Sequence, residues 1–228
     1  MAGQKSNTIV LVSGGLDSAV CLAAICASDP EDCKIFPVFF YYGQRNAKEC
    51  FYADAVVQHY RDLHRNVQEL KYIHIRNLFR QLVVSSSITN PSLPLEKKKD
   101  VALPNTFVPG RNIIFLACMA SYAEEVGADR ICIGVNSVST PGYPDCRAEF
   151  IFKMGLAITA GTSFPKKIST PVGHMSKAET IKLGLKLNAP LKFTWSCHDN
   201  GKLPCGKCDS CESRMEAFEE LGLPDPAL

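Results

Sequence analysis

The chain has 228 residues, 46% hydrophobic and 21% charged, and its 25 Lys and Arg nearly balance its 23 Asp and Glu. This composition is typical of a folded globular protein and excludes collagen, coiled-coil and disordered chains, and the balanced charge disfavours nucleic-acid binding and favours a small-molecule substrate. No apolar run is long enough to span a membrane and residues 1–7 lack a secretion signal, which predicts a cytoplasmic protein.

Hydrophobic periodicity predicts strands that alternate with helices along most of the chain. The expected strands cover residues 8–12, 35–41, 67–75, 130–135 and 166–170, and the expected helices cover residues 18–27, 47–60, 111–126, 148–160 and 176–187. Ser176 and Glu179 have the spacing of a capping box at the start of the last of these helices. The alternation predicts an α/β fold with a parallel, Rossmann-like sheet that binds ligands at the carboxyl ends of its strands.

The periodicity stops near residue 190, where a cysteine-rich stretch begins. We therefore predict an α/β domain over residues 1–190 and a small metal-binding segment over residues 191–228. Residues 85–99 are rich in Ser, Pro and Lys and are long enough to form a mobile lid, although a plain solvated loop is equally consistent with them.

The string Ser-Gly-Gly-Leu-Asp-Ser at residues 13–18 lies between the first strand and the first helix. Its two glycines allow the backbone to approach an anion, and the helix N-terminus supplies unpaired N–H groups. The string is neither a Walker loop nor the spaced-glycine dinucleotide motif. It predicts a phosphate-binding loop, and the simpler alternative is a tight turn in which Ser or Asp caps the helix.

This string resembles the pyrophosphate loop (PP-loop) of the N-type ATP pyrophosphatases, which cleave ATP between its α and β phosphates. The resemblance implies that a substrate is activated by transfer of AMP, with Mg²⁺ bound beside the phosphates. The residues that it places around the pyrophosphate are Ser13, Gly14, Gly15, Leu16, Asp17 and Ser18. Asp17 either holds the Mg²⁺ or caps its helix, and Asp17 and Ser18 are assigned to catalysis.

Four further strings narrow the resemblance. They are Tyr-Gly-Gln-Arg at residues 42–45, Pro-Asn-Thr-Phe-Val-Pro-Gly-Arg-Asn at 104–112, Gly-Tyr-Pro-Asp-Cys-Arg at 142–147 and Thr-Trp-Ser-Cys at 194–197. With them the chain is similar to the 7-cyano-7-deazaguanine synthase (QueC) family. That family activates the carboxylate of 7-carboxy-7-deazaguanine with ATP, adds ammonia, and then dehydrates the amide to the nitrile used for queuosine. The resemblance also implies a homodimer.

Two arginines in these strings could neutralise the leaving group of such a reaction. Departing pyrophosphate needs a cation, and Arg111, at the start of a predicted helix, or Arg45 is expected to provide it. The alternative for either arginine is a structural ion pair. On the same resemblance, Tyr42 and Gln44 are assigned to the ATP site.

The turn at residues 142–147 is expected to contact the deazapurine, with Gly142 shaping it and Tyr143 lining the pocket. Arg147 is predicted to clamp the substrate carboxylate, and Asp145 to accept hydrogen bonds from the guanine-like edge. Phe107 either stacks on the deazapurine or belongs to the core.

Four of the eleven cysteines follow the pattern Cys-x7-Cys-x2-Cys-x2-Cys. The four are Cys197, Cys205, Cys208 and Cys211. Gly206 allows the tight turn between thiolates that a tetrahedral zinc site requires, and an iron–sulfur cluster is the alternative. A site closed by four thiolates has no open position for water, so its role is predicted to be structural. His198 adjoins a ligand and is expected to point away from the metal.

Ser139 stands where the family usually carries an aspartate. A carboxylate beside the acyl adenylate would attract ammonium and accept its proton, which Ser does poorly. Ser139 is therefore assigned to the catalytic site, and two interpretations follow. The first is nitrile synthesis with Ser as a tolerated variant. The second is an enzyme that stops after one activation and joins the deazaguanine to another amine, such as a protein N-terminus, as QueC-like relatives in antiphage operons do.

Two other classes of function are consistent with the phosphate loop. Enzymes that modify tRNA also use a PP-loop, but they usually add an RNA-binding domain, and here only Lys97, Lys98 and Lys99 form a basic run. A non-enzymatic nucleotide sensor would not need the strings that are expected to bind the base. Direct nucleic-acid binding is therefore not expected.

Overall fold

The computed structural model describes residues 6–64, 66–95, 103–138, 140, 142–163 and 165–227. Five parallel strands form one sheet in these residues, in the order β3-β2-β1-β4-β5. The strands are β1 (Asn7–Leu11), β2 (Ile35–Tyr41), β3 (Lys71–His74), β4 (Ala128–Cys132) and β5 (Lys167–Ser169). The predicted parallel α/β sheet is confirmed.

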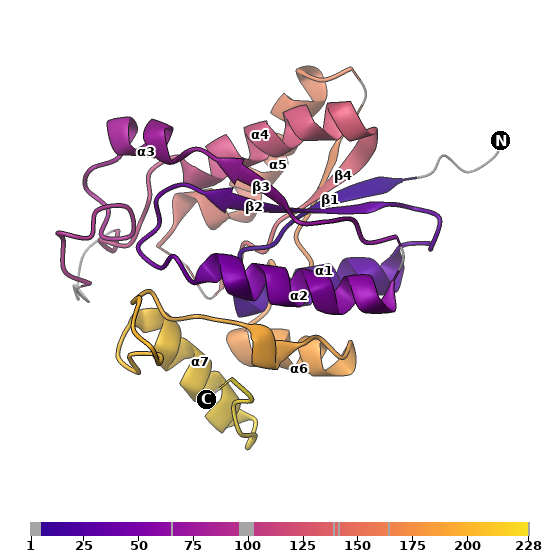
Figure 1. Ribbon diagram of the computed structural model, residues 1–228. Coiled ribbons are helices and arrows are strands. Elements are labelled where there is room, and N and C mark those ends of the chain that lie inside the picture. The colour runs from indigo at the N-terminus through magenta and orange to yellow at the C-terminus, as the bar shows by residue number, and fades with distance from the viewer. Residues whose placement is uncertain are drawn as a thin grey trace.

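Helices cover both faces of the sheet, with α1, α2 and α6 on one face and α4 and α5 on the other (Figure 1). The α-helices are α1 (Leu16–Ser28), α2 (Glu49–Leu63), α3 (Arg76–Leu82), α4 (Arg111–Val126), α5 (Ala148–Ala160), α6 (Lys177–Lys186) and α7 (Asp209–Glu220). Two short 3-10 helices, η1 (Pro144–Cys146) and η2 (Leu191–Phe193), complete the described elements. The capping box predicted from Ser176 and Glu179 opens α6.

Strand alternation divides the core into two layers. Ile9 and Leu11 of β1 pack with the apolar face of α4, whereas Val10 and the adjacent Val12 pack with α1. Because β1 is buried on both faces, it reads in the sequence as a continuous apolar run rather than an alternating one.

The order of the strands reverses beside β1, since β2 and β3 lie on one side of it and β4 and β5 on the other. Chain segments that leave the carboxyl ends of β1 and β4 therefore diverge, and ligands of open α/β sheets bind in the crevice between such segments. The loops that hold residues 13–15 and 134–138 begin at these two ends.

A buried arginine connects the two ends of the C-terminal segment. Arg214 of α7 pairs with Asp225 at 2.6 and 2.9 Å, and it donates to Thr194 Oγ1 at 2.8 Å. Only 7% and 4% of the two paired side chains are exposed. Loss of either partner of the pair would leave an uncompensated buried charge. The pair holds α7 against the chain that follows it, and the hydrogen bond to Thr194 holds α7 against the chain that precedes the cysteines.

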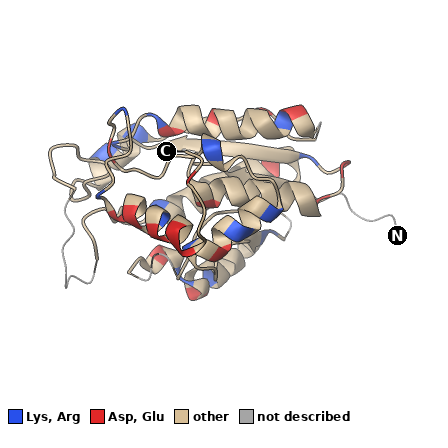
Figure 2. Ribbon diagram, turned by 90° about the horizontal axis from the view of Figure 1, so that it is seen from below, with Lys and Arg blue, Asp and Glu red and all other residues tan. Residues whose placement is uncertain are grey.

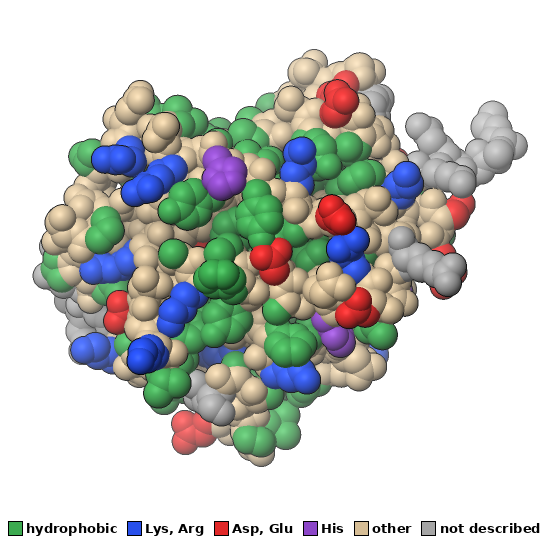
Figure 3. Space-filling view, viewed as in Figure 1, with side chains coloured by type: hydrophobic (Ala, Val, Ile, Leu, Met, Phe, Trp, Pro, Cys, Tyr) green, Lys and Arg blue, Asp and Glu red, His purple; other side chains and the backbone are tan. Residues whose placement is uncertain are grey.

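Charge on the surface is mixed, as the composition suggests. Figure 2 shows Lys and Arg interspersed with Asp and Glu along the helices, and in Figure 3 both signs lie among hydrophobic and polar side chains. In the described ranges no helix is both long and apolar enough to cross a membrane.

Candidate active site

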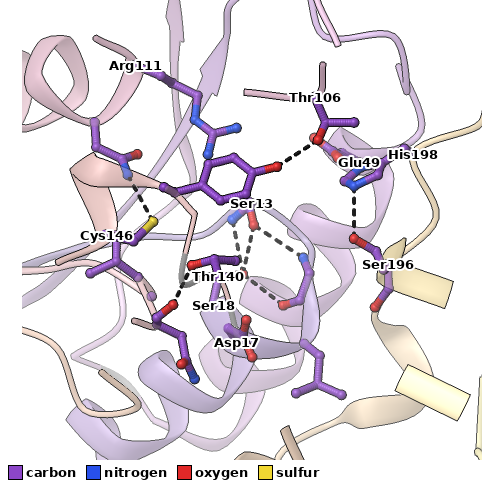
Figure 4. Close-up of a pocket in the computed structure, with 18 of the residues that line it drawn as sticks. Ser13, Asp17, Ser18, Glu49, Thr106, Arg111, Thr140, Cys146, Ser196 and His198 are labelled. Atoms are coloured by element: carbon purple, nitrogen blue, oxygen red, sulfur yellow. Dashed lines mark hydrogen bonds between the residues drawn. The ribbon is translucent and has the colours of Figure 1, made fainter. Parts of the chain in front are cut away.

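A cavity of about 570 Å³ lies at the carboxyl ends of β1 and β4. The described residues that line it come from the loop after β1, the chain between β2 and α2, the chain before α4 and its first turn, the loop after β4, the start of α6, and the C-terminal segment around the cysteines (Figure 4). This volume is in the usual range for a small-molecule site.

The loop at residues 13–18 is shaped by its own hydrogen bonds. Ser18 Oγ donates to the carbonyl of Gly15 at 2.9 Å and accepts from the amide of Ser13 at 3.1 Å. Gly15 is the N-cap of α1, so the unpaired amides and the positive dipole end of that helix meet the loop. Such an arrangement stabilises a bound phosphate.

Gly14 is the position in this loop where no other residue fits. Its φ is +81°, and a Cβ there would lie 2.5 Å from the carbonyl oxygen of Glu49, the first residue of α2. The amide of Trp195 donates to the Gly14 carbonyl at 2.9 Å. The loop is thus in close contact with both α2 and the C-terminal segment.

Asp17 pairs with Lys177, a cavity residue that the sequence analysis did not identify. Lys177 Nζ lies 2.7 Å from both carboxylate oxygens of Asp17. Because Gly15 is the N-cap of α1, Asp17 does not cap that helix. One feature of the sequence could have indicated Lys177 as a cavity residue. It directly follows the capping-box residue Ser176 and so stands at the start of a helix that comes after a strand.

Arg111 is the first residue of α4 and follows Gly110, whose φ is +69°. Its guanidinium lies 6.0 Å from the centre of the Tyr42 ring and donates to the Tyr42 hydroxyl at 3.4 Å. Figure 4 shows Arg111 across the cavity from Asp17. A cation in this position can neutralise an anionic group that reaches between the two walls.

Aromatic and hydroxyl side chains line the cavity beside Arg111. Tyr143 and Thr106 share a hydrogen bond of 2.7 Å between their hydroxyls, and both line the cavity together with Gly142. Phe40 and Phe115 stack with their centroids 4.2 Å apart and also contribute to the wall. Flat apolar walls with a few hydroxyls suit a planar heterocycle.

Two expected nucleotide ligands lie in different surroundings. Gln44 lines the cavity but braces the chain after β2, because it accepts from the Tyr42 amide at 3.0 Å and donates to the Phe40 carbonyl at 3.1 Å. The guanidinium of Arg45 donates to the Leu93 carbonyl at 2.8 Å, and Arg45 is not among the described lining residues. Arg45 therefore holds the loop before residue 95. This loop is part of the stretch 85–99 that was considered as a lid, of which residues 96–99 lie outside the described ranges.

Three expected substrate contacts are also missing from the described lining. Asp145 is buried and accepts from the Asn112 amide at 3.3 Å, so it supports the start of α4. Arg147 is exposed at the N-cap of α5, and Phe107 packs edge-on against Tyr143. These positions do not support the roles that were expected of Asp145 as reader of the base edge and Arg147 as carboxylate clamp.

Ser139 lies outside the described residues. Its neighbour Thr140 lines the cavity and donates through its hydroxyl to the Asn136 carbonyl. The loop after β4 therefore contributes to the site, as the position of Ser139 in the sequence had suggested.

The four cysteines expected to bind a metal converge. The sulfur atoms of Cys197, Cys205, Cys208 and Cys211 all lie within 4.8 Å of one another. The sulfur of Cys197 accepts hydrogen bonds from the amides of Asp199 and Cys205, both at 3.3 Å. Amide donors of this kind favour the thiolate form, so the cluster fits a metal held by four sulfurs.

The cysteine cluster brings a wall to the cavity that the sequence analysis did not predict. Its described lining residues are Trp195, Ser196, His198, Asp209, Ser210, Ser213 and Arg214. His198 Nε2 shares a hydrogen bond of 2.9 Å with Ser210 Oγ, and burial lowers the pKa of His198 to about 4, which leaves the ring neutral. The indole of Trp195 donates to the Cys197 carbonyl at 2.8 Å, which links the wall directly to the cluster.

Solved structures share this fold. An NMN synthetase from Francisella tularensis aligns with a TM-score of 0.54 and 13% identity, over 96% of this chain and 79% of that one. The U34-tRNA thiolase NcsA from Methanococcus maripaludis aligns with a TM-score of 0.50 and 17% identity, over 95% and 65%. At these identities the similarity concerns the fold alone.

Sequence relatives are much nearer. A 7-cyano-7-deazaguanine synthase from Oceanobacillus iheyensis is 42% identical, over 99% of this chain and 98% of its own length. Another, from Acetivibrio thermocellus, is 43% identical over 96% of each chain. The family model described as queuosine biosynthesis protein QueC matches residues 7–222. On its fold, its cavity and these matches, the chain belongs to the QueC family of PP-loop proteins.

Proposed function

We propose that the protein converts 7-carboxy-7-deazaguanine into 7-cyano-7-deazaguanine by two successive ATP-dependent activations. The first would form an acyl adenylate that ammonia converts to the amide, and the second would activate the amide for dehydration to the nitrile. The observation that carries the proposal is the convergence of the loop at residues 13–18 and the strings at 104–112 and 142–147 on one cavity. The relatives that bear the synthase name support the same substrate.

The first step is an attack of the substrate carboxylate on the α-phosphorus of ATP. The bond to the bridging oxygen breaks, and pyrophosphate leaves into the loop and the N-terminus of α1. Lys177 and Arg111 are the cavity cations placed to neutralise the phosphates and the carboxylate. Tyr143 and Thr106 would hold the heterocycle at the other end.

Two metals belong to this proposal. Mg²⁺ bound to the phosphates would add to the neutralisation of the leaving group. Asp17, which faces the cavity at the loop and pairs with Lys177, is the carboxylate that would hold it. Zinc is the metal that best suits the four thiolates of the C-terminal cluster, and its role there would be to hold the cavity wall.

Ser139 motivates the second candidate function. If the missing carboxylate reflects a different nucleophile, the enzyme stops at the acyl adenylate and joins it to another amine, such as a protein N-terminus. Ser139→Asp should then raise turnover with ammonia, because it restores an acceptor for the ammonium proton. A tRNA-modifying activity is the third and weakest candidate. A cytoplasmic homodimer is our expectation for the assembled enzyme.

The decisive experiment identifies the products. The protein is incubated with Mg²⁺, ATP, 7-carboxy-7-deazaguanine and ammonium, and the products are weighed by mass spectrometry while the nucleotides are separated. Nitrile with AMP and pyrophosphate is the expected result. Amide or a conjugate without nitrile would favour the second candidate, and release of ADP and phosphate would refute adenylation.

Lys177→Gln should reduce the rate of acid-dependent ATP–pyrophosphate exchange by about 10²–10³-fold, the usual loss when one donor to a developing anion is removed. Lys182→Gln is the matched control, because Lys182 is exposed on the same helix. Its exchange rate should equal that of the unmodified protein. Equal rates for both variants would exclude Lys177 from the phosphate site.

A further inference from the structure

The cavity holds a carboxylate for which the adenylation step has no use. Its described lining contains three acidic residues, which are Asp17, Glu49 and Asp209. Asp17 is paired through both oxygens with Lys177, and Asp209 lies in the first turn of α7, where the helix dipole favours a negative charge. Glu49 also lies in the first turn of its helix, α2, but it takes no part in the ion pair of the phosphate loop.

Glu49 opens α2 and faces the cavity. Its Oε2 is 3.5 Å from the Gln44 side-chain nitrogen, at the long limit of a hydrogen bond. Figure 4 shows Glu49 beside His198, on the side of the cavity away from Cys146. The carboxylate of Glu49 therefore has no short hydrogen bond to Gln44 and lies in reach of a ligand in the cavity.

Electrostatics suit Glu49 to take up a proton near neutral pH. Burial raises the pKa of Glu49 to about 7, although the charge of Arg111 and the hydrogen bond from Gln44 act in the opposite direction. The hydroxyl of Tyr42 and the thiol of Cys50 are other titratable groups that interact with it. A general base is most effective when its pKa lies close to the working pH.

We propose that Glu49 is the catalytic base that binds the incoming ammonium ion in the cavity and removes its proton before the nitrogen attacks the acyl adenylate. This assignment rests on the proposed function. Three features of the structure carry it: the cavity position of Glu49, its weak engagement by Gln44, and the commitment of Asp17 to Lys177. The sequence provides a fourth, since the loop at residues 136–141 contains no carboxylate.

Ammonium gives one proton to the Glu49 carboxylate, and the resulting ammonia forms a C–N bond to the carbonyl carbon of the acyl adenylate. The C–O bond to AMP breaks, and its electron pair leaves on the phosphate. The second proton that the nitrogen loses is taken by the departing AMP phosphate. The products are the amide, protonated AMP and neutral Glu49, which returns its proton to water.

Glu49→Gln is the main test, because Gln keeps the size of the side chain and can still accept from Gln44, but it cannot take a proton. Two half-reactions are measured in the same preparation: acid-dependent ATP–pyrophosphate exchange, and amide formation from ammonium. We expect the exchange rate to stay within about threefold of that of the unmodified enzyme. We expect the rate of amide formation to fall by at least about 100-fold. Glu69→Gln is the control, since 84% of the Glu69 side chain is exposed.

Hydroxylamine separates a base from a structural support. It is mostly unprotonated at neutral pH, so it needs neither the attraction of a carboxylate nor removal of a proton before attack. Glu49→Gln should therefore form the hydroxamate at nearly the unmodified rate while its reaction with ammonium stays slow. Glu49→Asp should recover part of the ammonium reaction, because it restores a carboxylate.

Three results would overturn the assignment. One is an unchanged rate of amide formation in Glu49→Gln. Another is an equal loss with hydroxylamine and ammonium that Glu49→Asp does not relieve, since that pattern describes a structural role. The third is an absence of exchange in the unmodified enzyme, which refutes the proposed function itself and is recognised before any variant is made.

Discussion

Gly14→Ala is expected to abolish acid-dependent ATP–pyrophosphate exchange. The added Cβ would lie 2.5 Å from the Glu49 carbonyl oxygen and 2.8 Å from the Ala53 amide nitrogen. Both are backbone atoms of α2, so no side-chain rotation relieves the overlap, and either the loop or the helix must move. A displacement of about 1 Å near reacting groups costs on the order of 10² in rate. The left-handed φ of +81° adds about 1–2 kcal/mol of destabilisation.

Gly127→Ala is the matched control for this variant. Gly127 also has a positive φ, +63°, but no described atom lies within 4 Å of a Cβ built there. It should therefore lose about 1–2 kcal/mol of unfolding free energy, measured by chemical denaturation, and retain exchange. Equal exchange in the two variants would show that backbone conformation, and not close approach to α2, explains the glycine at position 14.

Cys208→Ser should prevent the C-terminal cluster from holding the proposed metal and inactivate the enzyme. Four thiolates close a structural site, and the loss of one removes much of the binding free energy that folds the surrounding chain. A loss of about 3 kcal/mol in the free energy of unfolding would lower the thermal midpoint by roughly 6–12 °C. Exchange should be lost as well, because the chain from Trp195 to Arg214 forms one wall of the cavity.

The measurements are metal content per chain by mass spectrometry, the thermal midpoint, and ATP–pyrophosphate exchange. Cys118→Ser is the control, since Cys118 is a partly buried cysteine of α4, remote in sequence from the cluster. It should keep the metal and the exchange activity. Full activity of Cys208→Ser without bound metal would refute the view that the cluster holds the cavity wall.

Local patterns in the sequence predicted most of the fold. The bounds of α4 and α5 match the expected helices to the residue, and β2 matches its expected strand. Each of these elements carries enough apolar residues at one period to be recognised alone. α3 is short, and α7 has few apolar residues and contains the last of the four cysteines, so neither has a strong signal of its own. Both depend on contacts that only the folded chain provides.

The site was predicted less evenly than the fold. Residues of the loop after β1 were identified because their backbone chemistry is local, whereas Asp145 and Arg147 were assigned to the substrate from residue type alone. A carboxylate or guanidinium has many possible partners. In the structure Asp145 accepts a hydrogen bond from the Asn112 amide, and Arg147 is exposed. The division of the chain at residue 190 stays a prediction.

The order of elements, the phosphate loop and the metal-ligand spacing could be read from the sequence because each depends on residues close together in the chain. Which charged groups meet in the cavity could not. Asp17 and Lys177 are 160 positions apart, and they meet because the sheet order places α1 beside α6. Glu49 faces the cavity, and Gly14 lets α2 approach the loop there. Long-range packing decides such contacts, and no local pattern records it.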